Sequence, residues 1–178
     1  MPYVLRGVAH TETLSWLVLG SVLTSAGRHA EALTAFDTAL QLGHAQSSPL
    51  FIAEALLRRA RLHTQCDRWA QAIEDLNTAE PLLAGSADPM RVSQYAWLRV
   101  RCQIAQGLSL NRGFVEQLGA ITQRSAHPLL HLRLAGIEVE IALQDGNSAA
   151  AEQAALRQAQ IAGDAGLLEM YVDDLLLQ

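Results

Sequence analysis

The residues whose types could do chemistry are few and lie close together in two places. His127 and His131 stand four residues apart in the run HPLLH, and His63, Cys66 and Asp67 lie within five residues of one another. Two imidazoles one helical turn apart have the spacing of metal ligands, and a thiol near an imidazole is the arrangement of a cysteine nucleophile. A metal would still need a third and a fourth ligand, and a nucleophile would need a group that orients its base.

Each of these clusters also has a structural interpretation. Pro128 disfavours helical geometry at the residue before it, so His127 is expected to lie outside the helix and not to share a face with His131. Asp67 stands where a turn glycine is expected, and Cys66 falls in the packing pattern of its segment. We therefore expect no metal, no cofactor and no catalytic residue.

The charged residues exclude several classes of enzyme. Glu138 and Glu140 are two residues apart, so on a helix they point in different directions, and we expect them to be solvated rather than paired for catalysis. All 13 basic residues are arginine. Without a lysine, the chain has no P-loop nucleotide site and no Schiff-base chemistry. The motifs GxSxG, HExxH and GxGxxG are also missing from the sequence. The chain is not expected to be an enzyme.

Composition favours packed helices. Of 178 residues, 50% are hydrophobic and only 5% aromatic, and leucine and alanine together supply 59. A net charge of −5 gives no attraction to nucleic acid, so no direct nucleic-acid binding is expected. The sequence shows neither a signal peptide nor an apolar stretch that could cross a membrane, which favours a cytoplasmic protein with reduced cysteines.

Small and large residues recur at helical spacings on either side of a Gly-Arg turn in segment 16–39. They are Trp16, Leu19, Gly20, Leu23, Gly27, Ala32, Phe36 and Ala39. Matching places forty residues on are occupied by Leu56, Ala60, Asp67, Ala72, Leu76 and Ala79. Further turns fall at Gly107 and at 145–147. The small residues Gly20, Ala32, Ala60 and Ala72 are expected to let paired helices approach closely. This pattern resembles the tetratricopeptide repeat, a helix-turn-helix unit.

The turns at 27, 67, 107 and 146 are spaced 40, 40 and 39 residues apart, more than the usual 34. Elongated units of this kind are similar to the tetratricopeptide-like region of the large ATP-dependent, MalT-type regulators of the LuxR family. That resemblance implies a bacterial sensor segment that receives an inducer or a regulatory protein. An unrelated helical bundle is the alternative.

The resemblance predicts an all-α fold: a right-handed, tetratricopeptide-like superhelix of about four helix-turn-helix pairs plus a C-terminal helix. We expect one domain over 1–178, with repeats at about 12–46, 50–86, 90–125 and 128–163. The nine predicted helices are 12–26, 29–43, 50–65, 68–83, 90–106, 110–124, 128–144, 148–162 and 166–177. The last is expected to cap the final pair; alternatively its apolar side is exposed and supports dimerisation.

Charge is distributed unevenly between the two helices of each pair. The predicted first helices carry seven arginines and four acids, and the second helices carry four arginines and seven acids. First helices line the groove in tetratricopeptide arrays, so the resemblance implies a basic inner wall. The predicted partner-binding residues are Glu54, Leu57, Arg58, Arg61, Gln65, Gln94, Trp97, Arg101 and Arg133. Alternatively, the arginines lie over apolar surface with their heads in water.

These observations predict a non-catalytic module that binds a protein or peptide segment, or a small effector, in its groove. Arg61 and Arg101 are expected to be aligned in successive repeats, with Leu57 and Trp97 one turn before them. The alternative function is a self-assembling scaffold or adaptor that forms homodimers through its terminal helices. An enzyme that uses His63 and Cys66 is a third, remote hypothesis.

Overall fold

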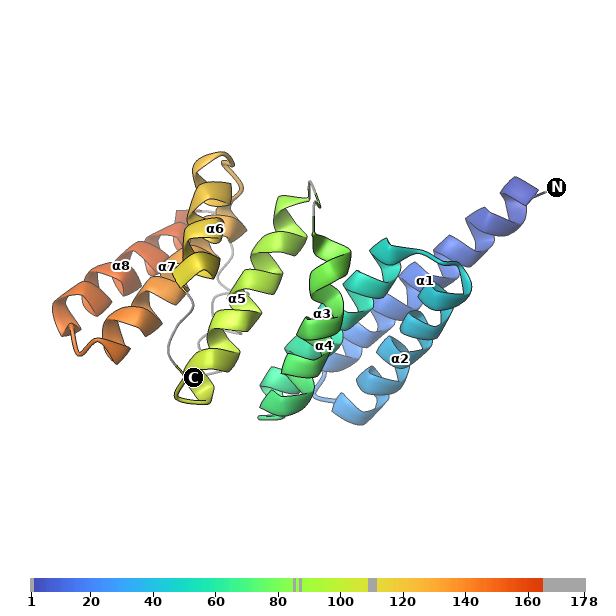
Figure 1. Ribbon diagram of the computed structural model, residues 1–178, viewed down its shortest axis with the longest axis horizontal. Helices are drawn as coiled ribbons and strands as arrows, with labels where there is room; N and C mark the ends of the chain where they lie inside the picture. Colours follow the sequence, from blue (N-terminus) through green and yellow to red (C-terminus); the bar gives the residue numbers. More distant parts are fainter. Residues whose placement is uncertain (1, 85, 87, 109–111, 165–178) are drawn as a thin grey trace. The chain divides into compact units, whose positions relative to one another are not determined.

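The protein is helical throughout the part described by the computed structural model, which covers residues 2–84, 86, 88–108 and 112–164 (Figure 1). Of residues 2–9 only the backbone is described. The eight helices are α1 (Pro2–Ser25), α2 (His29–Ala45), α3 (Pro49–Gln65), α4 (Trp69–Leu83), α5 (Pro89–Ala105), α6 (Arg112–Gln123), α7 (Pro128–Gln144) and α8 (Ser148–Asp164). An all-α fold is thereby confirmed, and no strand occurs among these residues.

Most predicted helix boundaries agree with the structure to within two residues. The first does not, because α1 begins at Pro2 instead of near residue 12, so Thr11 lies inside a helix and does not start one. Gly43 and Gly163 were expected to end helices but lie within α2 and α8. The predicted helix 166–177 lies outside the described residues.

The chain divides into two compact units, Met1–Ala87 and Asp88–Gln178. In unit 1, α1 packs on α2 and α3 on α4, and α3 also contacts both helices of the first pair. In unit 2, α5 packs on α6, α7 on α8, and α7 contacts both α5 and α6. Each unit is thus two consecutive helix pairs. The single superhelical domain over 1–178 stays a prediction.

The four predicted turn positions share one backbone conformation. Gly27, Asp67, Gly107 and Gly146 have φ of 72°, 54°, 64° and 68°, in the left-handed region. After each of them, the next residue donates its N–H to the carbonyl five residues earlier, at 2.9, 2.8, 2.9 and 2.8 Å in chain order. This is the Schellman motif that closes a helix C-terminus. The helix pairs therefore turn by the same mechanism in both units.

Proline and a capping side chain start three of the helices, as the sequence predicts. In α5, Asp88 Oδ1 accepts the N–H of Met90 at 2.9 Å ahead of Pro89. In α7, His127 Nδ1 accepts the N–H of Leu129 at 3.3 Å, with His127 in extended conformation before Pro128. These bonds give acceptors to backbone N–H groups of the first turn, which have no partner within the helix. His127 lies outside the helix, as expected.

Close approach of helices in the core depends on small residues. Gly20 of α1 faces Phe36 of α2 so closely that a Cβ on Gly20 would lie 2.4 Å from the ring atom Cε1. Ala32, Ala60 and Ala72, predicted to play the same part, have no exposed surface. The core of unit 1 therefore forms where a large side chain on one helix fills the space left by a small residue on another.

No described helix combines the length and the apolar character needed to cross a bilayer.

Candidate functional site

The nine predicted partner-binding residues all lie on the first helices of their pairs, α3, α5 and α7. They differ in what remains accessible. Glu54, Arg58, Arg61 and Gln65 of α3 and Gln94 of α5 are half-buried, with part of each side chain open to solvent. Of the remainder, Leu57 has no exposed surface and Trp97 is 5% exposed. These two side chains pack inside the protein, and their contact with a partner stays a prediction.

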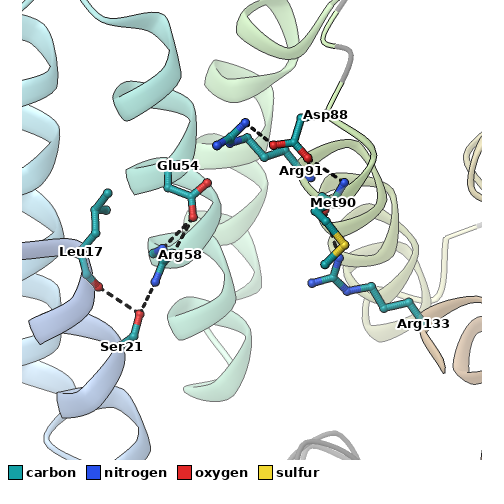
Figure 2. Close-up of polar contacts among 8 residues, drawn as sticks. All are labelled: Leu17, Ser21, Glu54, Arg58, Asp88, Met90, Arg91 and Arg133. Carbon is teal, nitrogen blue, oxygen red and sulfur yellow. Dashed lines mark hydrogen bonds and ion pairs between the residues drawn. The ribbon is translucent and has the colours of Figure 1, made fainter. Parts of the chain in front are cut away.

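In unit 1, Arg58 links α3 to α1. Its Nε donates to Glu54 Oε1 at 2.8 Å, and its Nη1 donates to Ser21 Oγ at 2.6 Å. Ser21 Oγ in turn donates to the carbonyl of Leu17 at 3.0 Å, so the chain of bonds ends on the backbone of α1 (Figure 2). The Arg58 side chain is nevertheless one-third exposed. It is held in place and still presents part of its charge to solvent.

Arg61 is one turn further along α3 and differs from Arg58. Within the part of the chain that the structure describes, its guanidinium makes no hydrogen bond and no ion pair, and its Nε is buried without an acceptor. A buried donor left unbonded costs free energy, and a charged one more than a neutral one. Arg61 is therefore the arginine of α3 that an acceptor from outside the chain would satisfy.

The sequence analysis missed the part of this surface that α1 contributes. Leu14, Val18 and Ser21 stand forty residues before Glu54, Arg58 and Arg61, so the repeat places them at the same positions of the preceding helix. Leu14 is 51% and Val18 58% exposed. We call these six residues the groove face of unit 1, after the groove that the tetratricopeptide resemblance implies. Subtracting the forty-residue repeat length from Glu54 and Arg58 would have identified Leu14 and Val18, the apolar residues of this face, from the sequence.

In unit 2, the guanidinium of Arg101 binds groups of the same unit. Its Nη1 lies 3.1 Å from Glu140 Oε1 of α7, and its guanidinium carbon is 5.4 Å from the centroid of the Trp97 ring. Both partners of the ion pair are at least 86% buried. Arg101 thus has an anion, Glu140, within unit 2, which Arg61 does not have among the described residues of unit 1, and the part of Arg101 in partner binding stays a prediction. Glu140 was expected to be solvated and is not.

Arg133 is likewise used internally. Its Nη1 donates to the carbonyl of Met90 at 3.1 Å (Figure 2). It also donates to Ser93 Oγ at 2.7 Å, so Arg133 joins the start of α7 to the start of α5. The residue is 9% exposed. A buried guanidinium bonded in this way contributes to the stability of unit 2, and its contact with a partner stays a prediction.

Unit 1 also contains an ionic network that the sequence analysis did not find. Arg59 of α3 donates to Asp75 of α4 through Nε at 3.0 Å and through Nη2 at 2.5 Å, and its Nη1 donates to Asp37 of α2 at 2.5 Å. These carboxylates raise the pKa of Arg59 above its usual value. One arginine thus ties three helices together. Arg59 is only two residues before Arg61 in the sequence, but its side chain stabilises the fold.

The thiol of Cys66 does lie beside an imidazole, but it is that of His29 and not that of His63, the partner considered in the sequence. Cys66 Sγ lies 3.2 Å from His29 Nδ1, whereas His63 Nε2 lies 3.8 Å from Asp75 Oδ2. Burial lowers the pKa of His63, and burial raises the pKa of the Cys102 thiol to about 11. Among the described residues, no three His, Cys, Asp or Glu side chains gather as metal ligands.

Unit 2 contains a cleft. This cleft of about 790 Å³ is lined by Gly107, Leu108, Arg112, Val115, Glu116, Ile141, Gln144 and Asp145. Arg112 Nη2 and Asp145 Oδ2 are 4.0 Å apart at its edge, both well exposed. Its lining contains no nucleophile beside a base, so it offers a place for contact rather than for bond chemistry.

A search of the chain against protein-family models, curated proteins and solved structures finds no match.

Proposed function

We propose that the chain is a non-catalytic module that binds an extended protein or peptide segment on the groove face of unit 1. The observation that carries the proposal is Arg61, a half-buried arginine whose Nε lacks an acceptor, next to a row of exposed apolar side chains on α1. A carboxylate from a partner would satisfy that donor with a charge-assisted hydrogen bond.

The groove face indicates the chemistry of the segment. Leu14 and Val18 of α1 offer apolar surface, while Arg58 and Arg61 offer positive charge on α3, which contacts α1. A segment that carries an apolar side chain near an acidic one matches both halves. A small effector with a carboxylate and an apolar body has the same chemistry, and the binding experiment below separates the two.

The surface is largely preformed, which supports binding without a large rearrangement. Glu54 and Ser21 hold Arg58 with bonds of 2.8 and 2.6 Å before any partner arrives. Fewer side chains then have to be ordered on binding, and less entropy is lost. On the resemblance of its elongated repeats, we further propose that the module is the sensing part of a bacterial transcriptional regulator.

The experiment uses a library of end-blocked synthetic peptides, each with one leucine and one aspartate at a varied spacing, in fluorescence polarisation against the full chain. Arg61→Ala is expected to weaken binding of the best peptide about tenfold or more. Arg68→Ala is the matched control, because Arg68 is an exposed arginine of the same unit at the start of α4. Its affinity should remain that of the wild type.

Two results would contradict the proposal. One is that Arg61→Ala and Arg68→Ala weaken peptide binding equally, which would show that only the net charge of the protein matters. The other is that no peptide binds while a free carboxylic acid with an apolar body does, which would make the ligand a small effector.

A further inference from the structure

Two positions recur in every helix pair and can be compared along the chain. The first is eight residues before the left-handed turn residue and is occupied by Leu19, Arg59, Arg99 and Glu138 in chain order. The second is ten residues after the turn and is occupied by Asp37, Asn77, Gln117 and Leu156. In unit 1 the two positions meet directly, since Arg59 of the second pair donates to Asp37 of the first at 2.5 Å.

The face of α3 around Arg59 is buried against the pair before it. Ala55 and Leu62, on either side of Arg59 on that face, are 1% and 0% exposed and belong to the same apolar cluster as Leu17 and Phe36 of the first pair. In unit 1 the preceding helix pair thus covers this face of α3.

The corresponding face of α1 is uncovered and apolar. Forty residues before the α3 set stand Ser15, Leu19 and Val22; Leu19 is 42% and Val22 60% exposed. We call these three residues the stacking face of α1. It is separate from the groove face, whose α1 members are Leu14, Val18 and Ser21. A helix face of this kind is usually covered by a partner.

The matching position on the last described pair is also an exposed leucine. Leu156 of α8 occupies the place that Asp37 has in the first pair, and it is 64% exposed. The other three residues at its position are polar, and so are the other three residues at the position of Leu19. Among the described residues, leucine occupies these two positions only on α1 and α8.

We propose that the stacking face of α1 binds α8 of a second copy of this chain, head to tail, with Leu19 against Leu156. The two leucines would take the place of the ion pair between Arg59 and Asp37, and the contact would repeat the packing of α3 on the first pair. Such a contact is heterologous: each added copy leaves one α1 and one α8 open, so the assembly grows by addition. This goes beyond peptide binding and uses different residues.

The test is sedimentation of the full chain over a wide range of protein concentration. The weight-average mass of the wild type is expected to rise above the 19.3 kDa of one chain as concentration increases. Leu19→Arg alone and Leu156→Asp alone should each weaken association about tenfold or more, because each places a charge against a leucine. The double variant should restore association, because it recreates the pairing of Arg59 with Asp37.

The matched control is Leu14→Arg, which puts the same charge on the groove face of the same helix, where the leucine is 51% exposed. It should associate like the wild type, and circular dichroism should show the same helical content in every variant. A wild type that stays at 19.3 kDa at every concentration would overturn the proposal. A double variant that stays monomeric, or a Leu14→Arg chain that dissociates, would also overturn it.

Discussion

Arg101 of α5 and Glu140 of α7 form a buried ion pair in unit 2, with 3.1 Å between Nη1 and Oε1. The two residues stand at the same position of consecutive helix pairs, six residues before the turns at Gly107 and Gly146. In unit 1 that position is occupied by Ser21 and Arg61, and no acid faces the arginine there. The same repeat position is therefore internal in one unit and available in the other.

The Arg101 pair makes a prediction about stability. Glu140→Ala leaves Arg101 buried without its carboxylate and is expected to lower the free energy of unfolding by about 3 kcal/mol. Glu138→Ala is the matched control, because Glu138 pairs with Arg157 of α8 at 2.6 Å where both side chains are well exposed, and an exposed pair contributes less than about 1 kcal/mol. Urea denaturation measures both. Equal losses would mean that the Arg101 pair is not a buried one.

A second prediction concerns the approach of α1 to α2. Gly20→Ala is expected to destabilise the protein by about 1–3 kcal/mol, because the new Cβ would lie 2.4 Å from the Phe36 ring. Alanine is otherwise the better helix former by about 1 kcal/mol, so the sign depends on the contact. Gly119→Ala in α6 is the control: nothing lies within 4 Å of its Cβ, and the same substitution should stabilise. Thermal unfolding of both variants gives the signs, and a stabilising Gly20→Ala would refute the packing described for this pair.

The turns predict opposite effects of two reciprocal substitutions. Asp67 has φ of 54°, a conformation that glycine adopts without strain, so Asp67→Gly should stabilise the protein by up to about 1 kcal/mol. Gly27 occupies the same place in the first pair with φ of 72°, so Gly27→Asp should destabilise it by a similar amount. Chemical denaturation measures both changes. If the two substitutions shifted stability in the same direction, the shared turn geometry would not be the cause.

His63 predicts how stability depends on pH. Burial lowers its pKa below the usual 6.5, an effect that Asp75 opposes and Arg59 and Arg68 reinforce. The unfolded chain therefore binds this proton more readily than the folded chain. Its contribution to stability is complete above pH 6.5 and is lost as the pH falls below that value. His63→Leu should lose less stability than the wild type between neutral and mildly acidic pH, as measured by thermal unfolding. Parallel pH profiles would exclude His63 as the cause.

Much of the local structure follows from the sequence. The repeat spacing located all four turns, and the predicted starts of α3, α5 and α7 agree with the structure to within one residue. The start of α1 was misplaced because Thr11 looks like a cap, and nothing local shows that the helix continues to Pro2. Gly43 was misread as a stop, although it lies against Ile52 of α3 and allows close packing. Glycine at a helix end and glycine at a contact look the same in a sequence.

The candidate site was harder to predict because it depends on which arginines find acids within their own unit. Arg59, Arg61 and Arg101 are alike in sequence, yet Arg59 binds Asp75 and Asp37, Arg101 binds Glu140, and Arg61 has an unbonded Nε. Those acids are 16 to 39 residues away. Comparing equal positions of neighbouring pairs would have matched Arg101 with Glu140, since both stand six residues before a turn. Arg59 binds acids on two other helices, α4 and α2, and neither acid stands at the repeat position of Arg59, so this comparison would not have found them.

The most direct test of the binding account is a titration of the isotope-labelled chain with the tightest peptide of the library, monitored by NMR at the arginine Nε–H groups. The account predicts a large chemical-shift change for the Arg61 Nε–H, because this buried donor gains an acceptor. The Arg59 Nε–H, which already donates to Asp75 at 3.0 Å, is expected to keep its chemical shift. Saturable peptide binding with an unchanged Arg61 resonance would contradict the account.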